Sequence, residues 1–269
     1  MPGVSVSTWS LHRQLGRAWY VQTDDGLQNR SEATDGIALM AVPAMVAAHG
    51  IHHLEVCHFH FPSTDPGYLH AFRDELDRND VTFHTLLIDT ADITHPDPEQ
   101  NDRELRTVEA WIDVAAQCGA KQARVVAGEA APSQEAIDLS AKNLGKMARY
   151  AHARGLGIAT ENFKKLTQRA GPLLQILDRC ADDIGLCADF GNFKGDTKFD
   201  DLAAVLPRAT TIHAKGGYVG GKLDELDFLR CMSLSKASGF DGHYVLIFSD
   251  EGEEWPYLDA LKQEVDGFL

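Results

Sequence analysis

Short apolar segments alternate with longer amphipathic segments along most of the chain. The clearest short segment is 184–190, an apolar run that carries Asp189 near its end and breaks at Gly191. An apolar run of this length, bounded by a turn residue, is typical of a strand that is buried on both faces in a parallel sheet. The pattern therefore predicts a buried strand that delivers one carboxylate at its C-terminal end.

Two neighbouring segments repeat this design. The segment 157–161 ends in Glu161, and the segment 210–215 carries His213 close to its end. One amphipathic segment separates each of these strands from the strand that carries Asp189. Three successive strand ends would bring two carboxylates and one imidazole to one place, and these are typical ligands of a divalent metal ion.

The rest of the chain continues the alternation of strand and helix. Strands are predicted over 4–10, 51–61, 81–89, 122–127, 157–161, 184–190, 210–215 and 243–249. Helices are predicted over 36–49, 67–79, 101–118, 133–154, 172–180, 200–206, 224–237 and from Pro256 onward. Strict alternation indicates parallel strands joined by right-handed crossovers, so we expect an α/β fold, a single (β/α)8 barrel over residues 1–269. An open doubly wound sheet is the alternative, but no GxGxxG follows the first strand.

Three details of this pattern lead to further expectations. Residues 13–35 lack periodicity and are expected to form a long loop over the strand ends. The glycine-rich stretch 216–222 is expected to be a mobile loop and a candidate lid. Alternation in the strand 81–89 places His84 on the same face as Leu86 and Ile88.

The amino-acid composition excludes several classes of function. The net charge of −15 argues against nucleic-acid binding, which rests on clustered Lys and Arg. The five scattered cysteines lack CxxC spacing and indicate reduced core residues. The sequence shows no secretory signal pattern and no apolar run of membrane-spanning length. We therefore expect a cytoplasmic protein that binds neither nucleic acid nor membrane.

The order of motifs resembles a known family. Glu161-Asn162, Asp189-Phe-Gly-Asn192, His213-Ala-Lys215 and Gly239-Phe-Asp-Gly242 follow one another as they do in the xylose isomerase-like barrels of the sugar phosphate isomerase/epimerase group. The resemblance implies a divalent ion, Mn²⁺ first and Mg²⁺, Co²⁺ or Zn²⁺ otherwise, held by the side chains of Glu161, Asp189 and His213. It also implies proton abstraction beside a metal-bound carbonyl, and a homodimer or homotetramer.

One position departs from the family pattern. The second glutamate, which is a metal ligand and a base in that family, is expected five residues after Gly242, where this chain has Ile247. Three alternatives are open: Asp250 takes its place, a water molecule does, or the position has no ligand. Glu251 and Glu253 also follow in the same loop. The endonuclease IV branch of the superfamily is unlike this chain, because Asn192 stands at the position of a histidine ligand and the acidic charge would repel DNA.

Other residues complete the predicted site. Glu161 and Lys215 are the candidate catalytic residues, since a lysine near a metal can move a proton or bind a substrate anion. Candidate substrate-binding residues are Trp9, His60, Asn162, Asn192 and Ser249. Trp255 is a second candidate wall for a sugar pocket. A structural role is the competing interpretation for His58, for His60 and for His84.

The function predicted is metal-dependent isomerisation or epimerisation of a small sugar, sugar phosphate or related keto-polyol. A dehydratase of a keto-sugar or keto-cyclitol is a close alternative, because it begins with the same proton abstraction. A barrel that binds a small carbohydrate without turning it over is the alternative from a different class, and Ile247 is the residue that favours it.

Overall fold

The computed structural model of this chain describes residues 3–31, 36–180 and 184–269. Eight parallel strands follow one another in chain order around a closed barrel, in which β1 pairs with both β4 and β12. The barrel strands are β1 (Gly3–Ser7), β4 (His53–Cys57), β5 (Thr82–Ile88), β6 (Gln122–Val125), β7 (Gly157–Glu161), β8 (Gly185–Asp189), β9 (Thr211–Lys215) and β12 (His243–Ile247). The predicted (β/α)8 barrel is confirmed.

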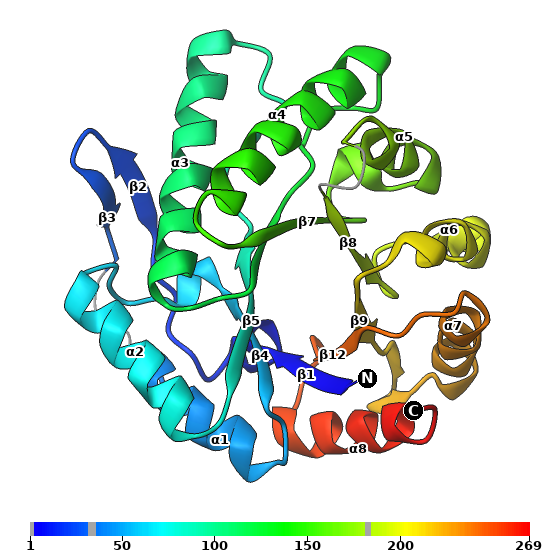
Figure 1. Cartoon of the computed structure of the whole chain (residues 1–269). Coiled ribbons are helices and arrows are strands. Elements are labelled where there is room, and N and C mark those ends of the chain that lie inside the picture. Colours follow the sequence, from blue (N-terminus) through cyan, green and yellow to red (C-terminus); the bar gives the residue numbers. More distant parts are fainter. Residues whose placement is uncertain (1–2, 32–35, 181–183) are drawn as a thin grey trace.

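The helices surround this barrel on its outside (Figure 1). They are α1 (Val42–Ala48), α2 (Pro66–Arg78), α3 (Pro98–Gln117), α4 (Gln134–His152), α5 (Ala170–Cys180), α6 (Lys198–Val205), α7 (Glu225–Ala237) and α8 (Glu254–Asp266). Local signals set several of their ends. The Ser133 side chain accepts a hydrogen bond from the Ala136 backbone at the start of α4, and Gly155 follows that helix with a φ of 79°.

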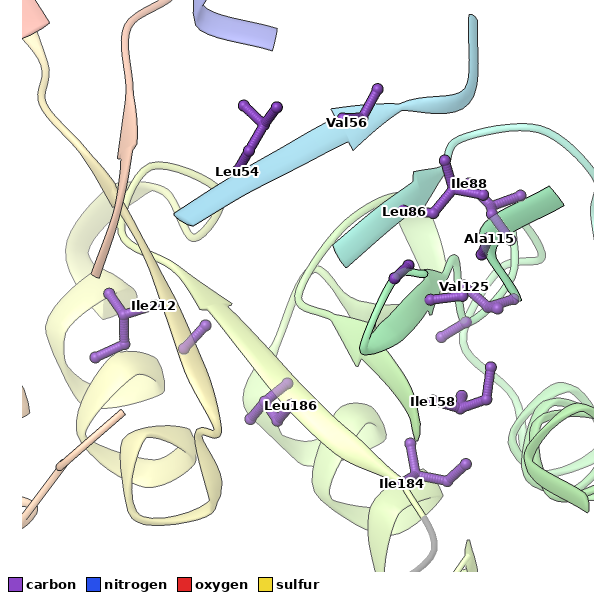
Figure 2. Close-up of a cluster of buried hydrophobic side chains, with 14 of the residues drawn as sticks. Leu54, Val56, Leu86, Ile88, Ala115, Val125, Ile158, Ile184, Leu186 and Ile212 are labelled. Carbon is purple, nitrogen blue, oxygen red and sulfur yellow. The ribbon is translucent and has the colours of Figure 1, made fainter. Parts of the chain in front are cut away.

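Outward-facing strand residues pack under the helices. Figure 2 shows part of this layer, with side chains such as Leu86, Val125 and Leu186 from neighbouring strands. Because successive side chains of a strand point to opposite faces, the residues next to these face the barrel interior. Leu186 therefore belongs to the outer core, while Cys187 and Asp189 point inward to the site described below.

One strand breaks this alternation. Leu54 of β4 pairs with Phe83, but Glu55 pairs with Thr85, so His84 is the extra residue of a β-bulge in β5. The prediction that His84 shares a face with Leu86 and Ile88 is therefore wrong. Its ring nitrogen Nδ1 lies 3.9 Å from a carboxylate oxygen of Glu55, inside the barrel.

Two predicted loops contain short antiparallel hairpins. The loop 13–35 forms β2 (Tyr20–Thr23) and β3 (Gly26–Asn29), which are joined by a two-residue turn at Asp24-Asp25. Residues 32–35 of this loop lie outside the described residues. The glycine-rich stretch forms β10 (Tyr218–Val219) and β11 (Lys222–Leu223), with Gly220 and Gly221 at positive φ between them. These glycines supply the left-handed conformations that a two-residue turn requires.

Two helices begin earlier than their prolines predicted. Pro172 and Pro256 are the third residues of α5 and α8, not the first. The first four N–H groups of a helix have no partner within the helix, so a proline is tolerated throughout the first turn. At the first helix the difference is opposite: a 3-10 turn at Leu39–Ala41 precedes α1, which begins only at Val42. Within the described residues, no helix has the length and apolar content needed to cross a membrane.

Candidate active site

A cavity of about 100 Å³ opens at the C-terminal ends of the barrel strands. The residues around it are Ser7, Trp9, Cys57, Leu87, Asp89, Arg124, Glu161, Phe163, Asp189, Asn192, His213, Lys215 and Ile247. Six of the predicted site residues are in this set: Trp9, Glu161, Asp189, Asn192, His213 and Lys215. The strand ends of a (β/α)8 barrel are where active sites are built, so this cavity is the candidate active site.

The three predicted metal ligands are brought together. Glu161 ends β7, Asp189 ends β8, and His213 lies directly opposite Asp189 in the pairing of β8 with β9. The Nδ1 atom of His213 lies 3.6 Å from Oε1 of Glu161 and 3.5 Å from Oδ2 of Asp189. All three side chains are buried.

A thiol lies beside this group. Cys187 pairs with Glu161 in the register of β7 and β8, and the donor atoms of Glu161, Cys187 and His213 lie within 4.8 Å of one another. Burial raises the pKa of Cys187 to about 11, so the free thiol is protonated at neutral pH. The donor set at this point therefore contains oxygen, nitrogen and sulfur.

Two asparagines orient the acidic residues. The side chain of Asn162 accepts a hydrogen bond from the Asp189 backbone N–H (2.7 Å) and donates to the Asp189 carbonyl (3.0 Å). It therefore holds the end of β8 and does not face the cavity. Asn192 lines the cavity and donates to Oε1 of Glu161 (2.9 Å). The Gly191 N–H donates to Oδ1 of Asp189 (2.6 Å), which leaves Oδ2 facing His213.

Arg124 supplies a buried positive charge on the same wall. It lies in β6, where Nη1 is 2.6 Å from Oδ1 of Asp89 and Nε is 3.0 Å from Oε2 of Glu161. Burial alone would lower the pKa of Arg124, but Asp89 and Glu161 raise it, so the guanidinium stays charged. Burial likewise opposes ionisation of Asp89, yet Arg124 shifts the pKa of this carboxyl below its ordinary value.

Glu55 binds the other nitrogen of His213. Its Oε2 lies 2.9 Å from Nε2 of the imidazole, across the barrel interior from β4. Burial would lower the pKa of His213, but Cys187, Glu161 and Glu55 raise it well above its ordinary value. A carboxylate on the far nitrogen of a histidine orients the ring and strengthens the near nitrogen as a ligand.

Lys215 lines the cavity next to Asp189. Burial raises the pKa of Asp189, but a hydrogen bond from His213 and the charge of Lys215 lower it overall. Gly191 makes room for the lysine, since a Cβ there would lie 2.7 Å from Cδ of Lys215. A larger residue at this position would displace the lysine from the site.

No carboxylate from the loop after β12 lines the cavity. Ile247 occupies the wall at the position of the expected glutamate. Ser249, Asp250 and Glu251 are exposed, and the Asp250 carbonyl accepts a hydrogen bond from Arg13. The structure therefore offers none of the loop carboxylates as a replacement ligand, and the predicted substrate-binding residue Ser249 lies outside the cavity wall.

The other aromatic and histidine candidates lie apart from the cavity, except Trp9. Trp255 stacks on His49, with ring centroids 3.8 Å apart. The Nδ1 atom of His60 lies 2.8 Å from the Thr8 hydroxyl, and burial lowers the pKa of His60 to about 3. His58 packs edge-on against Trp111. These contacts give His58 and His60 structural roles in this arrangement.

Three charged residues of the site were not singled out from the sequence: Glu55, Asp89 and Arg124. Asp89 follows the strand β5 directly, which is the same signal that identified Asp189. Glu55 and Arg124 are single charges inside otherwise apolar strands, at positions that alternate with outward-facing residues. A buried charge at such a position needs a partner, so this pattern was a usable signal.

The residues at the site fit a divalent ion. Oε1 of Glu161 and Oδ2 of Asp189 both face Nδ1 of His213, at 3.6 and 3.5 Å, so two oxygens and one nitrogen are directed at one point. The donor set of carboxylates and imidazole suits a hard or borderline ion. Glu161, Asp189 and His213 are the residues that would hold it, with Cys187 beside them.

The fold is shared with several solved structures. An L-ribulose 3-epimerase matches with a TM-score of 0.74 at 15% identity, over 100% of this chain and 95% of that one. A xylose isomerase-like TIM barrel protein from Mycobacterium smegmatis in complex with magnesium matches with a TM-score of 0.72 at 15% identity, over 99% and 96% of the two chains. A probable 3-DHS dehydratase from Bacillus anthracis matches with a TM-score of 0.70 at 13% identity, over 98% of each chain.

At these identities the likeness shows the shared fold. Among curated protein sequences, none matches this chain. A family model described as xylose isomerase-like TIM barrel matches residues 43–266, which is most of the chain. The chain therefore belongs to the xylose isomerase-like TIM barrel family.

Proposed function

We propose that this protein is a divalent-metal-dependent enzyme that isomerises or epimerises a small sugar, sugar phosphate or related keto-polyol. One observation carries the proposal. Glu161, Asp189 and His213 converge at one point of the cavity, where one oxygen of each carboxylate lies 3.6 or 3.5 Å from Nδ1 of His213. The family membership and the epimerases among the structural neighbours support the same reaction class.

The residues around the cavity suggest how a proton is moved. A bound divalent ion polarises a carbonyl and makes the adjacent C–H more acidic. Glu161, which Asn192 orients, accepts the proton from that carbon. Lys215 is the candidate donor that returns a proton, because Ile247 stands where the family pattern has its second carboxylate. Trp9 offers an apolar face to the C–H groups of the substrate.

The metal and the assembly are part of this proposal. Mn²⁺ is our first expectation, with Mg²⁺, Co²⁺ and Zn²⁺ as alternatives, and one structural neighbour is a magnesium complex. The thiol of Cys187 next to the donor atoms favours the softer ions Co²⁺ and Zn²⁺ over Mg²⁺. The partner is a small carbohydrate-like substrate, and we expect a homodimer or homotetramer in the cytoplasm.

A dehydratase is the second candidate function. Lys215 places a positive charge on the cavity wall, which suits a substrate that carries a carboxylate. A probable 3-DHS dehydratase is among the structural neighbours. The first step is the same proton abstraction by Glu161, after which Lys215 protonates a departing hydroxyl group instead of carbon.

The test is hydrogen exchange in deuterated water. Purified protein loaded in turn with Mn²⁺, Mg²⁺, Co²⁺ or Zn²⁺ is incubated with a panel of ketoses, ketose phosphates and keto-cyclitols, and deuterium is located by NMR. We expect deuterium beside the carbonyl with wild type and a loss of roughly 10²–10⁴-fold in Glu161→Gln. The control is Glu129→Gln, whose side chain is exposed and paired with Lys164.

The outcomes separate the candidates. Deuterium incorporation with an isomeric product supports the isomerase, and incorporation with loss of water supports the dehydratase. Saturable sugar binding without exchange under any metal contradicts both and favours the barrel that only binds carbohydrate. Equal exchange in wild type and Glu161→Gln would remove Glu161 from its proposed role.

A further inference from the structure

Three histidines meet at the opposite end of the barrel from the candidate active site. His53 and His243 begin β4 and β12, the two strands that flank β1. Their ring centroids are 4.3 Å apart, and the ring of His84 lies 5.3 Å from that of His243. Gly3 of β1 leaves space for this group, because a Cβ there would lie 2.9 Å from Nδ1 of His243.

A backbone irregularity brings His84 into the group. His84 is the extra residue of the bulge in β5, and regular alternation would have pointed it outward with Leu86 and Ile88. Bulges recur where a side chain has to be redirected. The bulge therefore turns the His84 imidazole toward the barrel interior, where regular pairing would not have placed it.

Two ring nitrogens of this group are buried without a well-aligned hydrogen bond. Nδ1 of His53 is buried and has no hydrogen-bond partner among the residues that the structure describes, while the buried Nδ1 of His243 makes no well-aligned hydrogen bond and the ring contacts the Gly3 backbone. Unpaired buried polar atoms are uncommon and call for an explanation such as an ion. Burial, followed by the neighbouring histidines, lowers the pKa of His53 to about 4, and burial together with His84 lowers that of His243. Both shifts favour the neutral imidazole, which is the form that binds a metal ion.

We propose that His53, His84 and His243 form a second metal site, at the N-terminal end of the barrel, for a borderline transition-metal ion such as Zn²⁺. A Zn–N bond of about 2.0–2.1 Å places the centres of two imidazoles on a tetrahedral ion about 5 Å apart. The observed separations of 4.3 and 5.3 Å lie on either side of this value. All three side chains are partly exposed, so an ion can enter from solvent.

Binding requires the rings to turn. As they lie, the three do not form a set of donor atoms within 4.8 Å of one another, unlike Glu161, Cys187 and His213. Rotation of a partly exposed ring takes place on the nanosecond scale and needs no change in the strands. The Nδ1 atom of His84 lies 2.8 Å from the Thr85 hydroxyl, and Glu55 lies on the same side, so Nε2 is its ligand atom.

Glu55 connects this site to the active site. One of its oxygens lies 3.9 Å from Nδ1 of His84 and the other 2.9 Å from Nε2 of His213. A carboxylate behind a metal-bound histidine strengthens the ligand. An ion at the three histidines would also join β4, β5 and β12, so we expect it to stabilise the barrel, in keeping with the structural role of this end in (β/α)8 proteins.

The test counts bound Zn²⁺ with the whole chain. Wild type, His243→Ala, Asp189→Ala and the double variant are stripped of metal, loaded with Zn²⁺ alone, dialysed and measured by elemental analysis. We expect each single variant to bind one equivalent less than wild type and the double variant to bind two less. His52→Ala is the matched control, because His52 adjoins His53 in sequence but is exposed and bonded to the Asp80 carbonyl.

A spectroscopic measurement guards against a folding defect. Cu²⁺ added to Asp189→Ala should give an electron paramagnetic resonance spectrum with hyperfine splitting from several nitrogens, and His53→Gln should reduce their number. Far-ultraviolet circular dichroism of each metal-free variant checks the fold. Equal Zn²⁺ content in His243→Ala and wild type, or a Cu²⁺ spectrum unchanged in His53→Gln, would overturn the proposal. Neither result bears on the proposed isomerase, which depends on the other end of the barrel.

Discussion

The two sides of the barrel mouth shift the pKa of a buried histidine in opposite directions. On the side of β6–β9, which we call the charged side, His213 lies among carboxylates and its pKa is well above the ordinary value. On the side of β12, β1 and β4, the neutral side, His60 lies beside Thr8 and aromatic rings, and burial lowers its pKa to about 3. Both side chains are buried to a similar extent. Burial alone therefore does not set the charge, and the neighbouring groups decide it.

The same division governs what the cavity can bind. Carboxylates, the imidazole and two cations approach from the charged side, while Trp9 and Ile247 form the other wall. A polar substrate with one apolar ring face fits such a cavity, with its oxygens toward the charged side. Substitutions that disturb this division should lower stability most where a buried charge loses its partner.

Removing the buried cation should cause the largest loss. In Arg124→Met, Asp89 and Glu161 keep their charges without their partner, so we expect the free energy of unfolding at pH 7 to fall by about 3–5 kcal/mol. The folded-state pKa of Asp89 is lowered by Arg124, so its contribution is present above the unfolded value of 3.8 and is lost below it. The difference between wild type and variant should therefore shrink as pH falls below 4.

Urea titration at several pH values measures this difference. The control is Arg208→Met, which breaks an exposed pair with Asp178 and should cost at most about 1 kcal/mol. A loss in Arg124→Met no larger than that of the control would mean that the charges of Asp89 and Glu161 are balanced by other groups.

The charged side also shows what the sequence could predict. Glu161, Asp189 and His213 end apolar runs within one stretch of the chain, so their common location followed from the order of strands. Glu55 contacts His213 across 158 positions of sequence, and no local pattern records such a pairing. The sequence showed only that Glu55 is a carboxylate within an apolar strand. Such a residue needs a buried partner, but the partner can be named only when the closed barrel is known.

Local backbone features also differ in whether the sequence signals them. The sequence of the hairpin of β2 and β3 contains a turn signal, Asp24-Asp25 followed by Gly26, but its strands of four residues are too short for alternation to stand out. The bulge at His84 has no such signal. It arises because the registers of β4 and β5 shift by one residue, which depends on strand pairing and not on the residues of β5 alone.

Placing a carboxylate on the neutral side should have an intermediate effect. Ile247→Glu buries an unpaired carboxyl group, and without metal we expect the free energy of unfolding to fall by about 1–3 kcal/mol. If a metal ion binds at Glu161, Asp189 and His213, the new carboxylate should recover this loss on addition of Mn²⁺. Thermal melts with and without Mn²⁺ measure the recovery, and Ile247→Gln is the control of equal size. Equal metal responses of the two variants would place Ile247 out of reach of the ion.

Removing a neutral histidine should have the smallest effect at pH 7 and a distinct effect in acid. The pKa of His60 falls from 6.5 to about 3 on folding, because of burial and then of Arg17, His12 and His58, so the unfolded chain binds the additional proton. Its contribution to stability is complete above pH 6.5 and declines as pH falls toward 3. His60→Gln keeps a partner for the Thr8 hydroxyl but does not titrate, so wild type should lose more stability than the variant between pH 7 and pH 4.5.

Carboxyl groups titrate in both proteins and cancel in the difference, and the exposed His70→Gln serves as control. A difference that does not change with pH would mean that His60 gains a partner for its charged form, and the neutral side would then resemble the charged one.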